Sequence, residues 1–264
     1  MSIALAMLVQ NEIDLAITSA AFIRQFREDW PDARQTAFVA EAQEEGTLTY
    51  KYGNFTIAVM SIEKPMADVT AELCASSRLW PDGRQFNTEY QAHTIVTILP
   101  EGDDKDRESS VLLSQVVASL VAISPETIGV YWAAANHLIA ADLFRRMAKE
   151  VLPAPLFEVW VALNVGHRPE DGAITAHTVG LNNLGLMDVE IPNSTKDAAG
   201  TYEFLTNIAL YLLDNGLIIK DGDTVGESAE ERIKAIYAGS LVDPLKTVIQ
   251  LQGETKPQQA ALSG

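Results

Sequence analysis

The sequence predicts an α+β fold built from two ferredoxin-like halves, whose antiparallel sheets are covered by helices and pack as one compact body. Two observations lead to this prediction. Apolar runs typical of strands alternate along the chain with segments whose apolar residues recur at helical spacing. In addition, the strand-like runs 47–52 and 55–62 flank Gly53-Asn54, a pair that suits a tight hairpin. With 264 residues, 47% of them hydrophobic, the chain can bury a substantial core.

Residues 1–100 form the first predicted half. Its predicted elements in chain order are a strand over 2–9, a helix ending at Trp30, the hairpin, a helix opened by Pro65 and a strand over 93–99. The order β-α-β-β-α-β is that of a split βαβ arrangement, in which two helices cover one face of an antiparallel sheet.

Residues 101–252 form the second predicted half, which broadly repeats this plan with an inserted helix. The polar composition of 253–264 is typical of a flexible tail. The predicted elements are a helix over 112–121, a strand over 127–132, a helix over 138–151, strands over 157–165 and 173–179, a long helix capped by Asn193 or Ser194 and ended by Gly216, and closing strands over 217–219, 232–237 and 247–251.

Composition restricts the classes of partner. With 36 acidic against 19 basic residues, the formal net charge is −17, so nucleic-acid phosphates would be repelled. A solvated surface that favours solubility is the favoured interpretation of this acidity, and the alternative is a surface that steers the protein toward a basic protein partner. No apolar stretch is long enough to cross a bilayer, and we expect no membrane association. Cys74 is the only cysteine, which rules out an intrachain disulfide, and its apolar setting predicts a buried thiol. The N-terminal apolar run lacks a preceding basic residue, so we expect a cytoplasmic protein.

Metal and cofactor motifs are weak. The four histidines, His93, His137, His167 and His177, fall on separate predicted elements and lack ligand spacing. Asp221-Gly-Asp-Thr224 resembles the start of a calcium loop but lacks its remaining ligands, so a turn is the favoured interpretation. We therefore predict no cofactor and no metal.

Gly180 and Gly185 predict a sharp turn between two strands, because no phosphate-loop lysine follows them. Beyond that turn, Asp188 and Glu190 project to one face if their strand is regular. Acid/base chemistry is conceivable for such a pair, but a solvent-exposed strand face is the favoured interpretation.

Three aromatic residues, Tyr131, Trp132 and Trp160, lie on predicted strands. They could form a binding surface, although packing in the core is the favoured interpretation.

Several short motifs occur in an order that resembles an uncharacterised bacterial family, domain of unknown function 4261, over roughly residues 80–251. The family has no agreed catalytic residues, so the resemblance implies no site. The motifs are Trp80-Pro81, Ala92-His93, Gly129-Val-Tyr-Trp132, Phe157-Glu-Val-Trp160, Thr178-Val-Gly-Leu181 with Gly185, Asp188-Val-Glu190 and Asp221-Gly-Asp-Thr224.

The leading functional hypothesis is a non-catalytic binding protein: an immunity protein that neutralises a toxin of interbacterial competition by occlusion with an acidic surface. No residue is assigned a catalytic role. The candidate partner contacts are Asp103, Asp104, Asp106, Asp188, Glu190, Glu227, Glu230 and Glu231. The alternative is an enzyme or a ligand- or metal-binding protein whose cleft uses His137, His177, Asp188 and Glu190. Self-association into a homo-oligomer is a third possibility.

Overall fold

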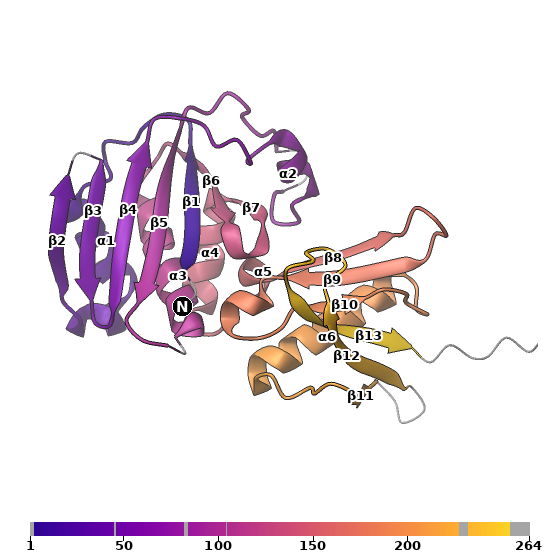
Figure 1. Ribbon diagram of the computed structural model, residues 1–264. Coiled ribbons are helices and arrows are strands. Elements are labelled where there is room, and N and C mark those ends of the chain that lie inside the picture. Colours follow the sequence, from indigo (N-terminus) through magenta and orange to yellow (C-terminus); the bar gives the residue numbers. More distant parts are fainter. Residues whose placement is uncertain (1–2, 45, 82–83, 104, 227–231, 254–264) are drawn as a thin grey trace, which may run out of the picture. The chain divides into compact units, whose positions relative to one another are not determined.

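The computed structural model describes residues 3–44, 46–81, 84–103, 105–226 and 232–253 (Figure 1). The chain divides into two compact units, Met1–Ala162 with Asn183–Gly185, and Leu163–Asn182 with Leu186–Gly264. Each unit contains one sheet packed with helices, which confirms the α+β class. The division after Ala162 lies later than the expected boundary at residue 100, because two further strands complete the first sheet.

The first unit is built on a seven-stranded sheet. Figure 1 shows the helices α1 (Ser19–Asp29), α3 (Asp106–Ile123) and α4 (Ala141–Val151) behind this sheet. The strands in spatial order are β2 (Phe38–Glu44), β3 (Thr47–Tyr52), β4 (Phe55–Ile62), β5 (Ala92–Pro100), β1 (Ala4–Gln10), β6 (Thr127–Trp132) and β7 (His137–Ala140).

The strand order of this sheet differs from the predicted split βαβ arrangement. A βαβ unit contains a parallel pair joined through a helix. In this sheet β1 pairs antiparallel with both β5 and β6, and the other pairings between its described strands are antiparallel too. The physical reason lies in the segment between β4 and β5. Its helix α2 (Ala71–Ser76) has only six residues and packs near β7 instead of covering the strands beside α1.

Two predicted elements of the first unit are corrected. The expected helix 138–151 begins with strand β7, which forms a hairpin with β6 around Asn136 at φ 48°. The expected strand 157–165 begins with the helical turn α5 (Phe157–Trp160) before β8 (Ala162–His167). Val159, Trp160 and Val161 are all buried, and a strand with one buried face would not bury three consecutive side chains.

Buried polar groups tie the helices of the first unit together. Both carboxylate oxygens of Asp29, at the end of α1, accept hydrogen bonds from the Arg145 guanidinium of α4, at 2.8 and 2.9 Å. Asp29 is 7% exposed, so this bidentate pair satisfies a carboxylate that burial would otherwise penalise. Ser119 of α3 donates to the same carboxylate at 3.0 Å, and the three helices therefore share one polar contact.

The second unit contains a six-stranded sheet and the helix α6 (Ala198–Asn215). In spatial order its strands are β11 (Thr224–Val225), β12 (Ile233–Gly239), β13 (Thr247–Gly253), β10 (Val189–Ile191), β9 (Ile174–Val179) and β8. Residues 217–219 are not a strand. The N-cap of α6 is Asp197, which accepts from the Gly200 N–H, in place of the expected Asn193 or Ser194, while Gly216 at φ 80° ends the helix as predicted.

One face of this second sheet packs against α6. Phe204 of α6 lines a small cavity together with Ile191, Ile233 and Leu251 from three strands. In the part of the chain that the structure describes, no helix has the length and apolar character needed to cross a membrane.

Candidate functional site

The face of the second sheet opposite α6 carries a row of polar side chains. In the strand register, Glu190 of β10 lies opposite His177 of β9 and beside Gln250 of β13. Side chains at paired positions of neighbouring strands project to the same face. The register therefore brings together two residues that the sequence could only place in separate strands.

The Glu190 carboxylate anchors the loop between β12 and β13. Its Oε1 accepts from the Ser240 hydroxyl, and the Leu241 N–H lies 3.1 and 3.0 Å from its two oxygens. The Gln250 side-chain amide lies 3.4 Å from Oε2. At 3% exposure, Glu190 is a buried acid whose acceptors are occupied by donors of its own unit.

The anchored loop, residues 240–246, has an ordered turn. The Ser240 hydroxyl oxygen accepts from the N–H groups of Val242 and Asp243, at 3.0 and 2.9 Å. The Ser240 N–H donates to the Lys246 carbonyl at 2.9 Å, which closes the base of the loop. Its apolar side chains are left in solvent: Leu241 is 68% exposed, Val242 57% and Leu245 96%.

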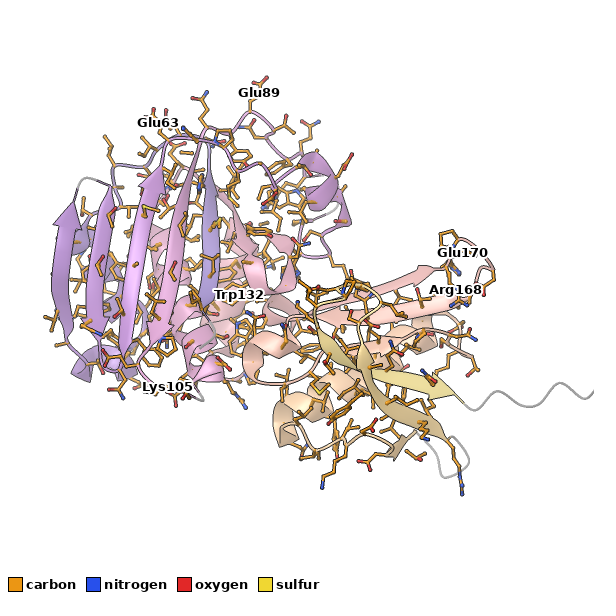
Figure 2. All side chains as sticks on the ribbon, in the orientation of Figure 1. Glu63, Glu89, Lys105, Trp132, Arg168 and Glu170 are labelled. Carbon is orange, nitrogen blue, oxygen red and sulfur yellow. The ribbon has the colours of Figure 1, made fainter. Side chains whose placement is uncertain are left out.

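A pocket of about 270 Å³ lies beside this loop. His177 and Glu190 contribute polar groups, and Figure 2 shows Arg168 and Glu170 near the tip of the β8–β9 hairpin that forms one side. The pocket is lined by His167, Arg168, Pro169, Thr175, Ala176, His177, Glu190, Ile191, Pro192, Leu241 and Val242.

His177 is one of the half-buried polar residues that line the pocket. Burial lowers the pKa of its imidazole, and the nearby Glu190 carboxylate offsets part of that effect. A neutral imidazole offers one hydrogen-bond donor and one acceptor. Arg168 is already engaged, since its guanidinium bonds Asp171 and reaches the Pro192 carbonyl at 3.3 Å. The pocket thus suits an uncharged polar group that can exchange a hydrogen bond with His177.

Asp188 has a separate, structural role. Its Oδ1 accepts from the Thr178 hydroxyl at 2.9 Å and from the Leu181 N–H at 3.0 Å, and burial raises the pKa of its carboxyl. These bonds hold the turn after β9, where Gly180 and Gly185 adopt φ 121° and 75°, as the predicted glycine turn requires.

The expected exposure of Asp188 and Glu190 on one strand face is wrong. Asp188 is 5% exposed and Glu190 3%, and they bond different partners. The reason is that β10 is a three-residue strand in the middle of the sheet, between β13 and β9. Neither acid can act as a surface contact in this structure.

The remaining acidic residues of the hypothesis lie elsewhere. Asp103 is exposed and Asp106 is half-buried at the start of α3, both in the first unit. Asp104, Glu227, Glu230 and Glu231 lie outside the described residues.

His167 also lines the pocket that contains His177, whereas His93 and His137 belong to the first unit. His137, in β7 of the first unit, contacts the Val159 carbonyl through Nε2 at 2.8 Å, and burial lowers its pKa to about 4. His93 is held through Nδ1 at 2.6 Å from the Lys64 carbonyl. Within the described ranges, no group of three or more His, Cys, Asp or Glu side chains is arranged to hold a metal ion.

The Asp221-Gly-Asp segment forms a turn, as predicted. Asp223 accepts from the Lys220 N–H and Asp221 from the Tyr237 N–H, each at 2.8 Å, while Gly222 has φ 87°. The Asp223 carboxylate therefore closes the turn on itself, and the Asp221 carboxylate fastens the turn to β12.

Core packing of the large aromatic residues is confirmed for the tryptophans. Trp132 is 2% and Trp160 1% exposed, and the Trp160 indole N–H donates to Ser114 at 2.9 Å. Tyr131 is half-buried, and its hydroxyl donates to Asn136 at 2.8 Å. Cys74 is buried as expected, and burial raises the pKa of its thiol.

Comparison with protein-family models matches residues 177–252 to a family described as domain of unknown function, DUF4261. The similarity to this family covers residues 177–252, which is less than half of the chain. The match confirms the family predicted from the motifs, although the motifs before His177 lie outside the matched residues. The DUF4261 segment contains Glu190 with its partners Ser240, Leu241 and Gln250. Comparison with curated proteins and with solved structures gives no match.

Sequence reasoning missed the loop that Glu190 anchors. Ser240 carried no signal of its own, because its role depends on a carboxylate 50 residues earlier in the chain. A sequence signal for this loop did exist. Leu241, Val242 and Leu245 are apolar residues around Pro244, in the connection between two strands, where polar turn residues are usual.

Proposed function

We propose that the protein is a non-catalytic binding protein that captures a partner protein with loop 240–246 and the adjoining pocket. The observation that carries this proposal is the exposure of Leu241, Val242 and Leu245 on a loop whose base is fixed by Glu190. Exposed apolar side chains that gather at one place mark interaction sites, and a preordered loop loses little entropy on binding.

The proposed partner presents an apolar anchor inside a basic surface. The net charge of −17 attracts such a surface over long range, and the apolar loop then supplies the short-range contact. A toxin of bacterial competition fits this class, and this protein would be its immunity protein. In this proposal Glu190 holds the conformation of loop 240–246, whereas the sequence had predicted a direct contact between Glu190 and the partner.

Growth rescue tests this function. The gene adjacent to this one is expressed alone and together with the wild-type protein or its Leu241→Asp, Leu245→Asp double variant. We expect the product of the adjacent gene to arrest growth and the wild-type protein to restore growth. The double variant should restore growth at least tenfold less well than the wild type. Leu15→Asp, at a residue 84% exposed in the first unit, is the matched control and should rescue fully. A harmless neighbour, or full rescue by the double variant, contradicts the proposal.

A second candidate function is small-ligand binding in the pocket where His177 and Glu190 meet. A catalytic role for Glu190 is disfavoured, because its oxygens already accept from Ser240, Leu241 and Gln250. Native mass spectrometry of the purified chain tests this candidate. A stoichiometric bound molecule that is lost in His177→Ala would support it, whereas bare wild-type protein would count against it.

A further inference from the structure

His177 differs from the other histidines in its hydrogen bonding. His93, His137 and His167 each lie at hydrogen-bond distance from a backbone carbonyl, at 2.6, 2.8 and 3.2 Å. Over the residues that the structure describes, the His177 imidazole has no hydrogen-bond partner, and Glu190 acts on it only through its charge. A half-buried imidazole therefore lines the pocket with its hydrogen-bonding capacity unused.

The charges beside the pocket favour an uncharged ligand. The Glu190 oxygens already accept from loop 240–246 and from Gln250, while the negative charge of this carboxylate repels an anion. The Arg168 guanidinium, held by Asp171, repels a cation. An ion would also lose hydration in a partly buried site that offers it no unpaired counter-charge.

Much of the remaining pocket lining is hydrocarbon. Leu241 and Val242 are 68% and 57% exposed, so a ligand in the pocket would cover apolar surface that water now contacts. A ligand that only exchanged a hydrogen bond would leave this surface uncovered, and a wholly apolar ligand would leave the imidazole unpaired. The apolar lining residues are Pro169, Ile191, Pro192, Leu241 and Val242.

The size of the pocket limits the ligand to one ring. Its volume of about 270 Å³ corresponds to roughly nine water molecules at about 30 Å³ each. An apolar cavity of about 150 Å³ holds benzene, so a six-membered ring with one polar substituent fits. The pocket is smaller than the about 300–1,000 Å³ of most sites for cofactors and drug-sized ligands.

We propose that the pocket binds the side chain of a tyrosine presented by the partner protein, with the tyrosine hydroxyl hydrogen-bonded to His177. The phenol is neutral near pH 7, because the ordinary pKa of tyrosine is about 10. Its ring would pack against Pro192, Leu241 and Val242. This inference rests on the proposed capture of a partner by loop 240–246 and names the side chain that the partner supplies.

Other side chains match the pocket less well. Phenylalanine has the ring but lacks the hydroxyl, while serine and threonine have the hydroxyl but lack the ring. The indole of tryptophan is larger and only donates, whereas a tyrosine hydroxyl both donates and accepts and so fits either tautomer of a neutral imidazole. Tyrosine is also enriched among the residues that contribute most to binding at protein interfaces.

Nuclear magnetic resonance titration of the full chain tests the proposal with three probes. N-acetyl-tyrosinamide carries the tyrosine side chain on its backbone, N-acetyl-phenylalaninamide lacks only the hydroxyl, and p-cresol is the tyrosine side chain alone. We expect the tyrosinamide to shift the signals of His177, Leu241 and Val242 in a saturable way, with a Kd on the order of millimolar. The phenylalaninamide should bind about fivefold more weakly, because it leaves His177 unpaired.

Two variants separate the hydrogen bond from the apolar contact. In His177→Leu the two amides should bind with equal Kd, because the imidazole that distinguishes them is gone. Val242→Ala should weaken both amides roughly twofold and keep their ratio. Glu203→Gln, an exposed residue on α6 at the other face of the sheet, is the control and should keep both Kd values. Amide spectra verify that each variant is folded.

Four outcomes would overturn the proposal. They are no saturable shift up to about 50 mM of any probe, equal Kd for the two amides in the wild type, a preference for tyrosine that survives in His177→Leu, and binding of p-cresol without binding of the tyrosinamide. The last outcome would assign the pocket to a free small phenol, because the partner's backbone must continue from the bound ring.

Failure of the proposed function would be visible separately, since the growth-rescue experiment uses none of these probes. A preference for tyrosine without growth rescue would support the ligand of the pocket and contradict the toxin partner. Growth rescue without a preference for tyrosine would overturn the inference about tyrosine alone.

Discussion

The Leu241 backbone N–H lies 3.1 and 3.0 Å from the two carboxylate oxygens of Glu190. A central, buried strand thus holds an exposed apolar loop through a single side chain. Because all of the donors belong to the loop or to β13, the carboxylate serves loop geometry, and its removal should be felt mainly at residues 240–246.

Glu190→Gln tests this anchoring. The amide keeps the shape of the side chain but turns one acceptor into a donor, which would face the Leu241 N–H or Gln250. We expect a loss of about 1–3 kcal/mol in the free energy of unfolding and faster amide exchange across 240–246. Hydrogen exchange with mass spectrometry measures the second effect. Glu203→Gln, an exposed acid on α6, is the control, and equal exchange in both variants would contradict the role assigned to Glu190.

Asp188 is expected to matter for stability and not for surface binding. Asp188→Ala leaves the Thr178 hydroxyl and the Leu181 N–H without their acceptor and should cost about 1–3 kcal/mol. Asp188→Asn retains an acceptor oxygen and should cost less. Thermal unfolding followed by circular dichroism compares the two, and a fully stable Asp188→Ala variant would show that the buried bonds are dispensable.

Gly129 lies where a side chain would meet its neighbours. A Cβ there would come within 3.0 Å of the Trp80 ring, 3.2 Å of Leu138 and 3.3 Å of the Ile139 carbonyl. Gly129→Ala should therefore destabilise the first unit by about 1–3 kcal/mol. Tryptophan fluorescence in urea measures this unit alone, because all four tryptophans lie within residues 1–162. The control is Gly166→Ala in the second unit, which has open space around its Cβ and should unfold like the wild type when unfolding is followed by circular dichroism.

His137 predicts a pH dependence of the first unit. Its folded-state pKa of about 4 lies below the ordinary value of 6.5, so the unfolded chain binds the proton more readily. The contribution to stability is complete above pH 6.5 and is lost as the pH falls towards 4, by about 3 kcal/mol. Urea unfolding followed by tryptophan fluorescence at several pH values measures this effect. As the pH falls, the free energy of unfolding should decrease less steeply in His137→Gln than in the wild type, while His167→Gln should follow the wild type. Identical slopes in all three proteins would refute the assignment.

Local signals were readable from the sequence. The Gly53-Asn54 hairpin, the Gly180 turn and the end of α6 at Gly216 depend on the conformations of one or two residues, and all are present. By contrast, β2 was not predicted, because the Ala, Glu and Gln residues of Phe38–Glu44 favour helix more than strand. Pairing with β3 overrides that local preference.

Strand order and the site depended on distant contacts. The sequence brought Asp188 and Glu190 to attention, yet it could not show that β13 would lie beside β10 and bury both acids. His177 and Glu190 were grouped in the alternative hypothesis, and the register places them opposite each other. His137, grouped with them, is instead buried in the first unit.

The parallel pairing of β10 with β13 has a consequence for synthesis on the ribosome. Val189 of β10 cannot pair until Ile249 of β13 has been synthesised. The last strand of the unit to leave the ribosome, β13, is therefore an interior strand of the sheet. Such distant pairing slows folding. The first unit can complete its sheet as soon as residue 140 has emerged, while the glutamate that organises the loop lacks its full set of donors until translation has passed Gln250.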